Sequence, residues 1–406
     1  MKRILIKAAG LTGKLVAGLL LVFLAAVCIT GVSPIYDFAA PKPFEGPKIF
    51  NPYRNLQLPA DWKRANFHTH TRVSGPLNEC EYTPLQTLQA LEKFDYDIVT
   101  FSNHNLLTEH PTDSALQVNV YEHGYNLFKF HKLVFGCSEV NHFDALVPLL
   151  PSQKQFQYDL LNGDCEILQM NHPFRTNGTS RRGMEEITGY RIIELDSGVS
   201  TDQEYWDWAL SAGHYSFATA SDDLHYPDRS WKIAVRCTFL QCPGVPTWEN
   251  LKASLLDGCY YCMRVPDYGK GDWDEKYRRN KDLPAVTNIG MKDSCTVFIC
   301  LDRQADSIRV TGQDGRTLLL AENCAEASYE MAPADPYARF TAFFEGGEII
   351  YSNAFARFDP AVSPTPYIYE PHGVNILLTV LWNLLMAALT GGCAFCMVRL
   401  FKKKKR

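Results

Sequence analysis

The sequence predicts an α/β body that continues into a small β-sandwich, with an apolar helix at each end of the chain. Three observations lead to this fold class. Strand-like and helix-like stretches alternate through residues 65–265, which favours a mainly parallel arrangement with a barrel as its natural closure. Residues 285–360 show strand alternation with turn signals, and the polar stretch 266–284 is interpreted as a linker. Both ends carry long uncharged runs.

The first apolar run occupies residues 12–34, and no charged residue occurs between Leu15 and Tyr36. About 20 apolar residues span a bilayer as a helix, and basic residues precede this run, which predicts a cytoplasmic amino terminus. A cleaved signal peptide is the alternative, although the run is long and no clear cleavage site follows it. Residues 35–64, rich in proline and aromatic side chains, are predicted to form an extended stalk.

The second apolar run occupies residues 374–398 and is followed at once by a basic tail, residues 399–406. A buried core helix is the alternative, but such a helix is rarely apolar on every face and then followed by consecutive basic residues. We therefore expect a second membrane helix. Both termini then lie in the cytoplasm, the chain is held in the cell membrane by two helices, and the body between them is extracytoplasmic.

The charge of the body differs from that of the ends. The chain of 406 residues has a formal net charge of -5, from 40 basic and 45 acidic residues. Ten of the basic residues lie before Asp37 or after Glu370, where there is no acid. The body is therefore strongly acidic and would repel phosphate backbones, so we expect no nucleic-acid partner.

Candidate metal ligands follow successive predicted strands of the body. Because the carboxyl ends of parallel strands meet at one edge, such side chains are expected to lie together. His68 and His70 are two residues apart on a strand and therefore share a face. Imidazole and carboxylate groups together suit zinc, manganese or iron. The other candidates at strand ends are His104, Glu139, His142, His172, Asp223 and His225.

These segments resemble the motifs of the PHP (polymerase and histidinol phosphatase) superfamily of metal-dependent phosphoesterases. The similarity runs from about Asn66 to Met263 through FHTHT, SNHN, EVNH, NHPFR and SDDLH, in that order. It implies a distorted (β/α)7 barrel. The later segment EIIYSNAFARF resembles the carboxyl-terminal sandwich of the branch that includes carbaryl hydrolase.

The resemblance also implies a ligand set of two or three divalent ions. One ion would be held by His68, His70, Glu139 and Asp223. A second would share Glu139 as a bridge and take His142 and His172. A third would take His104 and His225.

Two departures from the family pattern concern the third ion. The first motif usually continues into S-D-G, whereas Ser74 is followed by Gly75 and Pro76. The second motif usually has Asp before its histidine, and here it is Asn103. His104 and His225 are therefore either ligands, or proton donors and phosphate contacts. Arg175 either clamps a substrate phosphate or pairs with a nearby carboxylate.

The leading hypothesis is a membrane-anchored hydrolase of phosphate esters, acting on a small-molecule or cell-envelope substrate. The resemblance implies that bound ions activate water for attack on phosphorus, while His104 or His225 protonates the leaving oxygen. Two alternatives remain open at this point. One is hydrolysis of a carboxylic ester, amide or carbamate, and the other is a non-catalytic surface binding module on the same fold.

Overall fold

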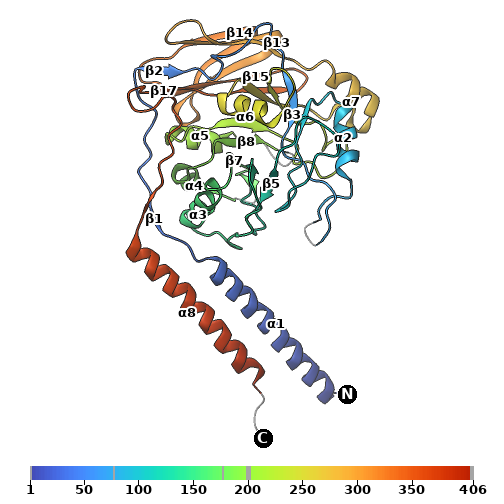
Figure 1. The fold of residues 1–406 in the computed structure, drawn as a ribbon, viewed down its shortest axis with the longest axis vertical. Helices are drawn as coiled ribbons and strands as arrows, with labels where there is room; N and C mark the ends of the chain where they lie inside the picture. Colours follow the sequence, from blue (N-terminus) through green and yellow to red (C-terminus); the bar gives the residue numbers. More distant parts are fainter. Residues whose placement is uncertain (1, 76–77, 176–177, 198–202, 403–406) are drawn as a thin grey trace.

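The computed structural model describes residues 2–75, 78–175, 178–197 and 203–402, and side chains from Leu11 onward. Its body is a mixed α/β structure, and two long helices leave one end of it (Figure 1). Strands β13 and β14 lie at the opposite end of the body. Pro76 and residues 403–406 of the predicted basic tail lie outside the described residues.

A five-stranded sheet forms the half of the body nearer the long helices. Every residue of its strands is buried, as expected for strands covered on both faces. The β7–β8 and β8–β9 pairs are parallel, whereas β6 runs antiparallel to both β5 and β7. In sheet order the strands are β5 (Val120–His123), β6 (Lys132–Phe135), β7 (Ile167–Met170), β8 (Ile192–Asp196) and β9 (Phe217–Ala220).

An eleven-stranded sheet forms the other half. It contains strands from both the predicted α/β part and the predicted β-sandwich. The two are joined by the antiparallel pair β11–β16, in which Tyr261 lies opposite Ser352 and Arg264 lies opposite Ile349. The predicted sandwich therefore continues the sheet of the α/β part. The strands are β2 (Lys48–Phe50), β3 (Lys63–Asn66), β4 (Ile98–Val99), β10 (Arg236–Leu240), β11 (Tyr260–Arg264), β12 (Val286–Met291), β13 (Thr296–Thr311), β14 (Thr317–Glu330), β15 (Tyr337–Phe343), β16 (Ile349–Ser352) and β17 (Phe355–Phe358).

The two sheets do not close into one continuous barrel among the described residues. Two isolated parallel bridges connect them, Thr69 with Leu224 and His104 with Glu122. The body helices are α2 (Pro84–Glu92), α3 (Pro151–Asn162), α4 (Arg181–Glu186), α5 (Glu204–Ser211), α6 (Trp248–Asp257) and α7 (Trp273–Asn280), with short 3₁₀ turns η2 (Tyr268–Gly271) and η3 (Gln313–Gly315).

Helix α7 forms inside the stretch that the sequence suggested as a linker. The Asp272 side chain caps it by accepting hydrogen bonds from the backbone N–H groups of Asp274 and Glu275. Its Asn280 side chain is buried and accepts a hydrogen bond of 2.9 Å from Arg64 of β3. This contact docks a polar helix on the body, which the low hydrophobicity of the segment did not suggest.

The long helices are α1 (Lys2–Thr30) and α8 (Ile376–Phe401). The spans Leu11–Thr30 and Ile376–Phe401 are long and apolar enough to cross a membrane. Beyond the helices, β1 (Tyr36–Asp37) pairs with β18 (Gly373–Val374), so the two connecting segments run together. The predicted stalk is only partly a stalk, because its strand β2 pairs with β17 of the body.

Candidate metal centre

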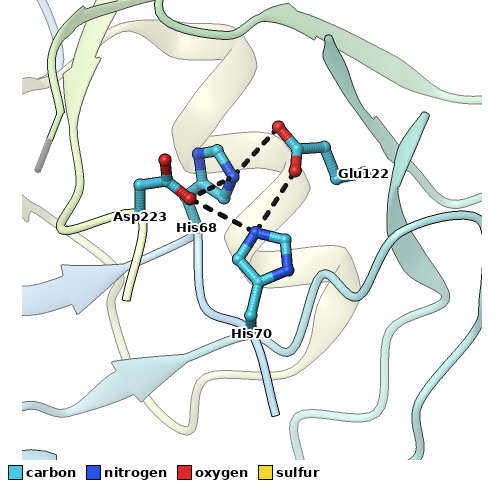
Figure 2. Close-up of side chains that lie close together, drawn as sticks. All are labelled: His68, His70, Glu122 and Asp223. Atoms are coloured by element: carbon cyan, nitrogen blue, oxygen red, sulfur yellow. Dashed lines mark ion pairs between the residues drawn. The ribbon is translucent and has the colours of Figure 1, made fainter. Parts of the chain in front are cut away.

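Four side chains converge where the two sheets meet: His68, His70, Glu122 and Asp223 (Figure 2). The Nε2 atom of His68 lies 3.1 Å from Glu122 Oε1 and 3.2 Å from Asp223 Oδ1. The Nε2 atom of His70 lies 3.2 Å from Glu122 Oε2 and 3.3 Å from Asp223 Oδ1. All four side chains are buried, so two imidazoles and two carboxylates share one small, water-poor space.

Glu122, at the carboxyl end of β5, is the centre of a larger cluster. Its carboxylate oxygens lie 3.1 to 3.3 Å from imidazole nitrogens of five histidines, which come from both sheets: His68, His70, His104, His131 and His172. A buried carboxylate surrounded by imidazoles offers the mixed oxygen and nitrogen donors that divalent metal ions prefer.

The backbone holds His68 and His70 in place through a link to the loop after β9. The N–H of Leu224 donates to His68 O at 3.2 Å, and the N–H of His70 donates to Leu224 O at 2.9 Å. Asp223, directly before Leu224, has a φ of 48°, an uncommon left-handed conformation for a non-glycine residue. Neighbouring Asp222 anchors this turn by accepting backbone hydrogen bonds from residues 234–236.

Glu194, at the core of β8, orients two of the histidines from behind. Its Oε1 lies 3.0 Å from His68 Nδ1, and its Oε2 accepts the backbone N–H of His172 at 3.0 Å. A proton on His68 Nδ1 is therefore directed to Glu194, which leaves the Nε2 lone pair facing Glu122 and Asp223. Such carboxylate–imidazole pairs are the usual support of metal-binding histidines.

Burial and neighbouring charges shift the pKa values of the carboxylates and imidazoles in the cluster. Burial opposes ionisation of Glu122, but the positive charge of His68 holds its pKa well below the ordinary value. Asp223 behaves in the same way, with His68 overcoming the effect of burial on its pKa. Burial lowers the pKa of His131 to about 3. For His68, the carboxylates of Glu122 and Asp223 outweigh burial and raise the pKa. Ionised carboxylates thus coexist with histidines that depend on them for charge balance.

The donor set fits a divalent metal. Among the described residues, His68 Nε2, His70 Nε2 and Asp223 Oδ1 are buried and have no hydrogen-bond partner of good geometry. Buried polar atoms without partners are costly, and these lie within 4.8 Å of one another and of a Glu122 oxygen. Nitrogen and oxygen donors in this number suit zinc, manganese or iron, and a cation would satisfy all of them at once.

We distinguish three groups of donors. The first is His68, His70, Glu122 and Asp223. The second is Glu122 with His131 and His172. The third is Glu79 with His104 and His225. Glu79 Oε2 lies 3.3 Å from His104 Nε2 and 3.2 Å from His225 Nε2. The other ring nitrogen of His225, Nδ1, donates to Asp223 O at 2.8 Å. Burial would lower the pKa of His225, but its hydrogen bond with Glu79 and the charge of Asp223 raise it. The sequence analysis did not identify Glu79. The expected acid directly follows the serine of the motif, whereas Glu79 lies five residues beyond Ser74.

Arg175 pairs with a carboxylate of the centre. Its Nη1 donates to Asp223 Oδ2 at 2.7 Å, and its side chain is 27 % exposed. It reaches into a cavity of about 530 Å³ beside the third group of donors. The cavity lining includes Glu79, Arg175, Asp223, His225, Tyr226 and Lys232. The two sequence alternatives for Arg175 are therefore compatible, since it pairs with Asp223 and also lines the cavity.

Glu139 and His142 are the two predicted ligands that do not join the cluster. Both side chains are exposed on the connection between β6 and α3. The reason is the direction of β6. Because β6 runs antiparallel to β7, its amino end lies at the metal centre and its carboxyl end lies at the far edge. The prediction that Glu139 and His142 are ligands assumed that β6 is parallel to its neighbours, and it is wrong because β6 is antiparallel to both.

The residues that take those places are Glu122 and His131. Glu122 is the second-last residue of β5, and His131 directly precedes β6, so the β5–β6 hairpin brings both to the same edge. The sequence does contain a signal for this hairpin. The strand-like run at Val120 is followed closely by Gly124, which has a φ of 125° in the turn. Read as a hairpin, this segment would have placed Glu122 and His131 together.

Comparison with known proteins adds the following. No family model matches the chain, and no curated protein matches it. A solved structure from Bacteroides vulgatus ATCC 8482 is similar, with 12 % sequence identity and a TM-score of 0.37. The similarity covers 78 % of this chain and 100 % of that chain. That protein is described as a two-domain protein containing a predicted PHP-like metal-dependent phosphoesterase.

Proposed function

We propose that this chain is a metal-dependent hydrolase of phosphate esters, anchored in the cell membrane with its body on the extracytoplasmic side. The observation that carries the proposal is the position of Glu122, fully buried and within 3.3 Å of five imidazoles. A cluster of this kind has no evident structural use without a cation, because it buries charge and leaves polar atoms unpaired.

The proposed ligands follow the three groups of donors. The first ion takes His68, His70, Glu122 and Asp223. The second takes Glu122, His131 and His172. The third, if the protein binds three ions, takes Glu79, His104 and His225. Bound zinc, manganese or iron would supply Lewis-acid polarisation of phosphoryl oxygens and an activated water at neutral pH.

The remaining polar residues then act on the substrate. Arg175 and Lys232 line the cavity beside the centre, together with the carboxylates of Glu79, Glu81 and Asp223. With cations bound to Glu79 and Asp223, the two basic side chains would favour an anionic group there, which supports a phosphate ester over a neutral ester or amide. With two ions bound, His225 is free to hold a proton on Nε2 for the leaving oxygen, with Glu79 stabilising its charged form. With three ions bound, His104 and His225 become ligands.

We further propose that the body is a distorted (β/α)7 barrel of the PHP kind. Seven strands, β3 to β9, would form its wall. The β3–β4 pair and the five-stranded sheet supply the ladders, and the bridges Thr69–Leu224 and His104–Glu122 lie at the two junctions. A ring joined at these points places the metal centre at one mouth of the barrel, as is usual for catalytic groups in such folds.

The two long helices support membrane anchoring. Trp382 Nε1 of α8 donates to Gly31 O at 2.9 Å, directly after α1, so the two helices pack where they enter the body. Basic residues flank the outer ends of both. The proposed topology puts both termini in the cytoplasm. Protease added to intact cells should then digest the body and spare short anchor fragments, whereas a fully protected body would overturn this topology.

The activity is tested with the full chain purified in detergent and loaded in turn with zinc, manganese and iron. We expect turnover of bis-p-nitrophenyl phosphate and loss of turnover in His68→Ala. Turnover of p-nitrophenyl acetate alone would transfer the proposal to carboxylic ester hydrolysis. Full metal occupancy without turnover of any phosphate, ester, amide or carbamate probe would indicate a binding module. No bound metal in the wild type would refute the proposal.

A further inference from the structure

A second feature of the body is a group of large apolar side chains exposed on two neighbouring loops. Tyr125 and Leu127 lie between β5 and β6, and Leu149 lies between β6 and α3. They are 42 %, 55 % and 62 % exposed. We call these three residues the loop-tip patch. We propose that the patch lies in a lipid headgroup layer of the membrane that α1 and α8 cross. This layer is the one on the same side of the membrane as the body. This inference rests on the proposed membrane anchoring.

Backbone hydrogen bonds fix the two loops to each other. The N–H of Leu127 donates to Leu146 O at 3.0 Å. Asp144 Oδ2 accepts the N–H groups of Tyr125 and Asn126 at 2.8 and 2.9 Å. The patch is therefore one surface made from two segments, and its apolar side chains are held at the tips.

The same loops are fixed to the end of helix α1. The N–H of Leu146 donates to Thr30 Oγ1 at 3.1 Å, and Thr30 is the last residue of the helix. At the start of α3, Gln153 Nε2 donates to Gly31 O at 2.9 Å. These bonds place the patch beside the point where the chain leaves the membrane span, and Figure 1 shows α3 next to the long helices.

The packing of α8 against α1 sets the depth of this point in the bilayer. Trp382 reaches Gly31, yet α8 begins six residues earlier, at Ile376, which is about 9 Å further along the axis. Ile376 and Leu377 in that first turn are 75 % and 69 % exposed, so the apolar surface of α8 extends past the level of Gly31. The headgroup layer on each side is roughly 5–8 Å thick. Loops bonded to Thr30 and Gly31 therefore lie at the bilayer surface.

The composition of the loops fits that position. Between Phe143 and Leu150 the only charged side chain is Asp144, which is 1 % exposed and occupied by the backbone of the other loop. Tyrosine is typical of membrane interfaces, where its ring is apolar and its hydroxyl remains hydrated. The β5–β6 loop also joins the ligands Glu122 and His131, so contact with lipid would hold the metal centre close to the headgroups.

The test uses the full chain with a benzophenone amino acid at single exposed positions, reconstituted in vesicles of phosphatidylglycerol and phosphatidylethanolamine. Benzophenone at position 127 or 149, in place of Leu127 or Leu149, tests whether the loop-tip patch contacts lipid. Leu385, 48 % exposed on α8, is the control for the membrane span. Leu320, 53 % exposed on β14 at the far end of the body, is the control for water. Each variant is first required to melt at the wild-type temperature. Irradiation is followed by mass spectrometry of peptide–lipid adducts.

We expect lipid adducts at positions 127, 149 and 385 and none above background at 320. Adducts at 385 but not at 127 and 149 would overturn the patch and leave the anchoring in place. The absence of adducts at 385 as well would overturn both proposals. Crosslinks from 127 or 149 to another copy of the chain, without lipid adducts, would show that this surface is a protein interface and would also overturn the inference.

Discussion

Two glutamate–histidine pairs lie on either side of strand β6, and they have opposite surroundings. Glu122 and His131 are buried at its amino end, 3.1 Å apart. Glu139 and His142 follow its carboxyl end and are exposed. Both pairs offer the same donor atoms. The direction of the strand, and not the residue types at its ends, therefore decides which pair can reach the metal centre.

The physical contrast between the pairs is one of solvation. Water stabilises the Glu139 carboxylate, so it needs no partner. Glu122 has lost its water, and burial of an unpaired carboxylate is costly. Its compensation comes from the imidazoles around it, which hold its pKa well below the ordinary value despite burial. A divalent ion would replace the proton that charges His68, so metal binding beside Glu122 should release a proton.

The largest expected effect separates the two glutamates by turnover. Glu122→Gln keeps the shape of the side chain but removes the charge that holds two cations together. We expect a loss of more than roughly 100-fold, because residues that only orient ligands already cost 10- to 100-fold. Glu139→Gln is the matched control and should retain wild-type turnover. Initial rates with a phosphodiester decide the matter, and a larger loss in Glu139→Gln would reverse the assignment.

The two histidines extend the same comparison to metal affinity. His131→Ala should weaken binding of one ion by roughly 10- to 100-fold, since the second group of donors loses a nitrogen. His142→Ala should bind metal as the wild type does. Competition with a chromophoric chelator measures both. Equal affinities in the two variants would mean that His131 is a buried structural residue.

Replacement of Glu79 should have a smaller effect on turnover, and it distinguishes whether His225 is a proton donor or a metal ligand. If His225 donates a proton, its charged form is required, and activity falls as pH rises through its pKa. Glu79 raises that pKa. In Glu79→Gln the pKa should therefore fall, and the basic limb of the pH–rate profile should move to lower pH. Glu92→Gln, at an exposed position at the end of α2 and outside the cavity lining, is the control.

Metal content separates the alternative role of Glu79. If a third ion binds, Glu79→Gln should lose that ion, whereas a proton-donor role leaves the metal content unchanged. An unaltered pH–rate profile together with unaltered metal content would remove Glu79 from the site altogether.

The smallest expected effect is on stability, and it comes from Lys132 of β6, the strand between the two glutamate–histidine pairs. Lys132 of β6 is fully buried, and burial lowers its pKa to about 7. Because the unfolded chain then binds more protons between pH 7 and pH 10, stability should rise with pH in that window. The expected slope is up to about 1.4 kcal/mol per pH unit for one proton.

Chemical denaturation of the full chain in detergent measures this slope. It should disappear in Lys132→Met and persist in Lys93→Met, where the lysine is exposed. Turnover should differ little between the wild type and Lys93→Met. A slope that survives in Lys132→Met would assign the titration to another group.

Much of the chain could be predicted from local patterns. Uninterrupted apolar runs identify α1 and α8, since few other structures tolerate such sequences. The spacing of His68 and His70 placed both side chains on one face, and His172 and Asp223 also follow strands that end at the centre. Each of these predictions needs only the properties of one segment.

The remainder depended on how segments pair. Glu122 and His131 require the knowledge that β6 is antiparallel, which follows from pairing with β5 and β7 and not from its own residues. Glu79 lies outside the strands, and its contacts with His104 and His225 join residues that are distant in the sequence. The shared sheet of the two predicted units depends on the β11–β16 pairing, between strands far apart in sequence.

If Glu122 bridges two metal ions, its replacement should lower the metal content of the protein. The full-length wild type, Glu122→Gln and Glu139→Gln are loaded with manganese or zinc, freed of excess ion, and measured by elemental analysis. We expect at least two ions per chain in the wild type and in Glu139→Gln, and a loss of bound metal in Glu122→Gln. Full occupancy in Glu122→Gln, or a loss of metal in Glu139→Gln, would show that Glu122 is not the bridging ligand.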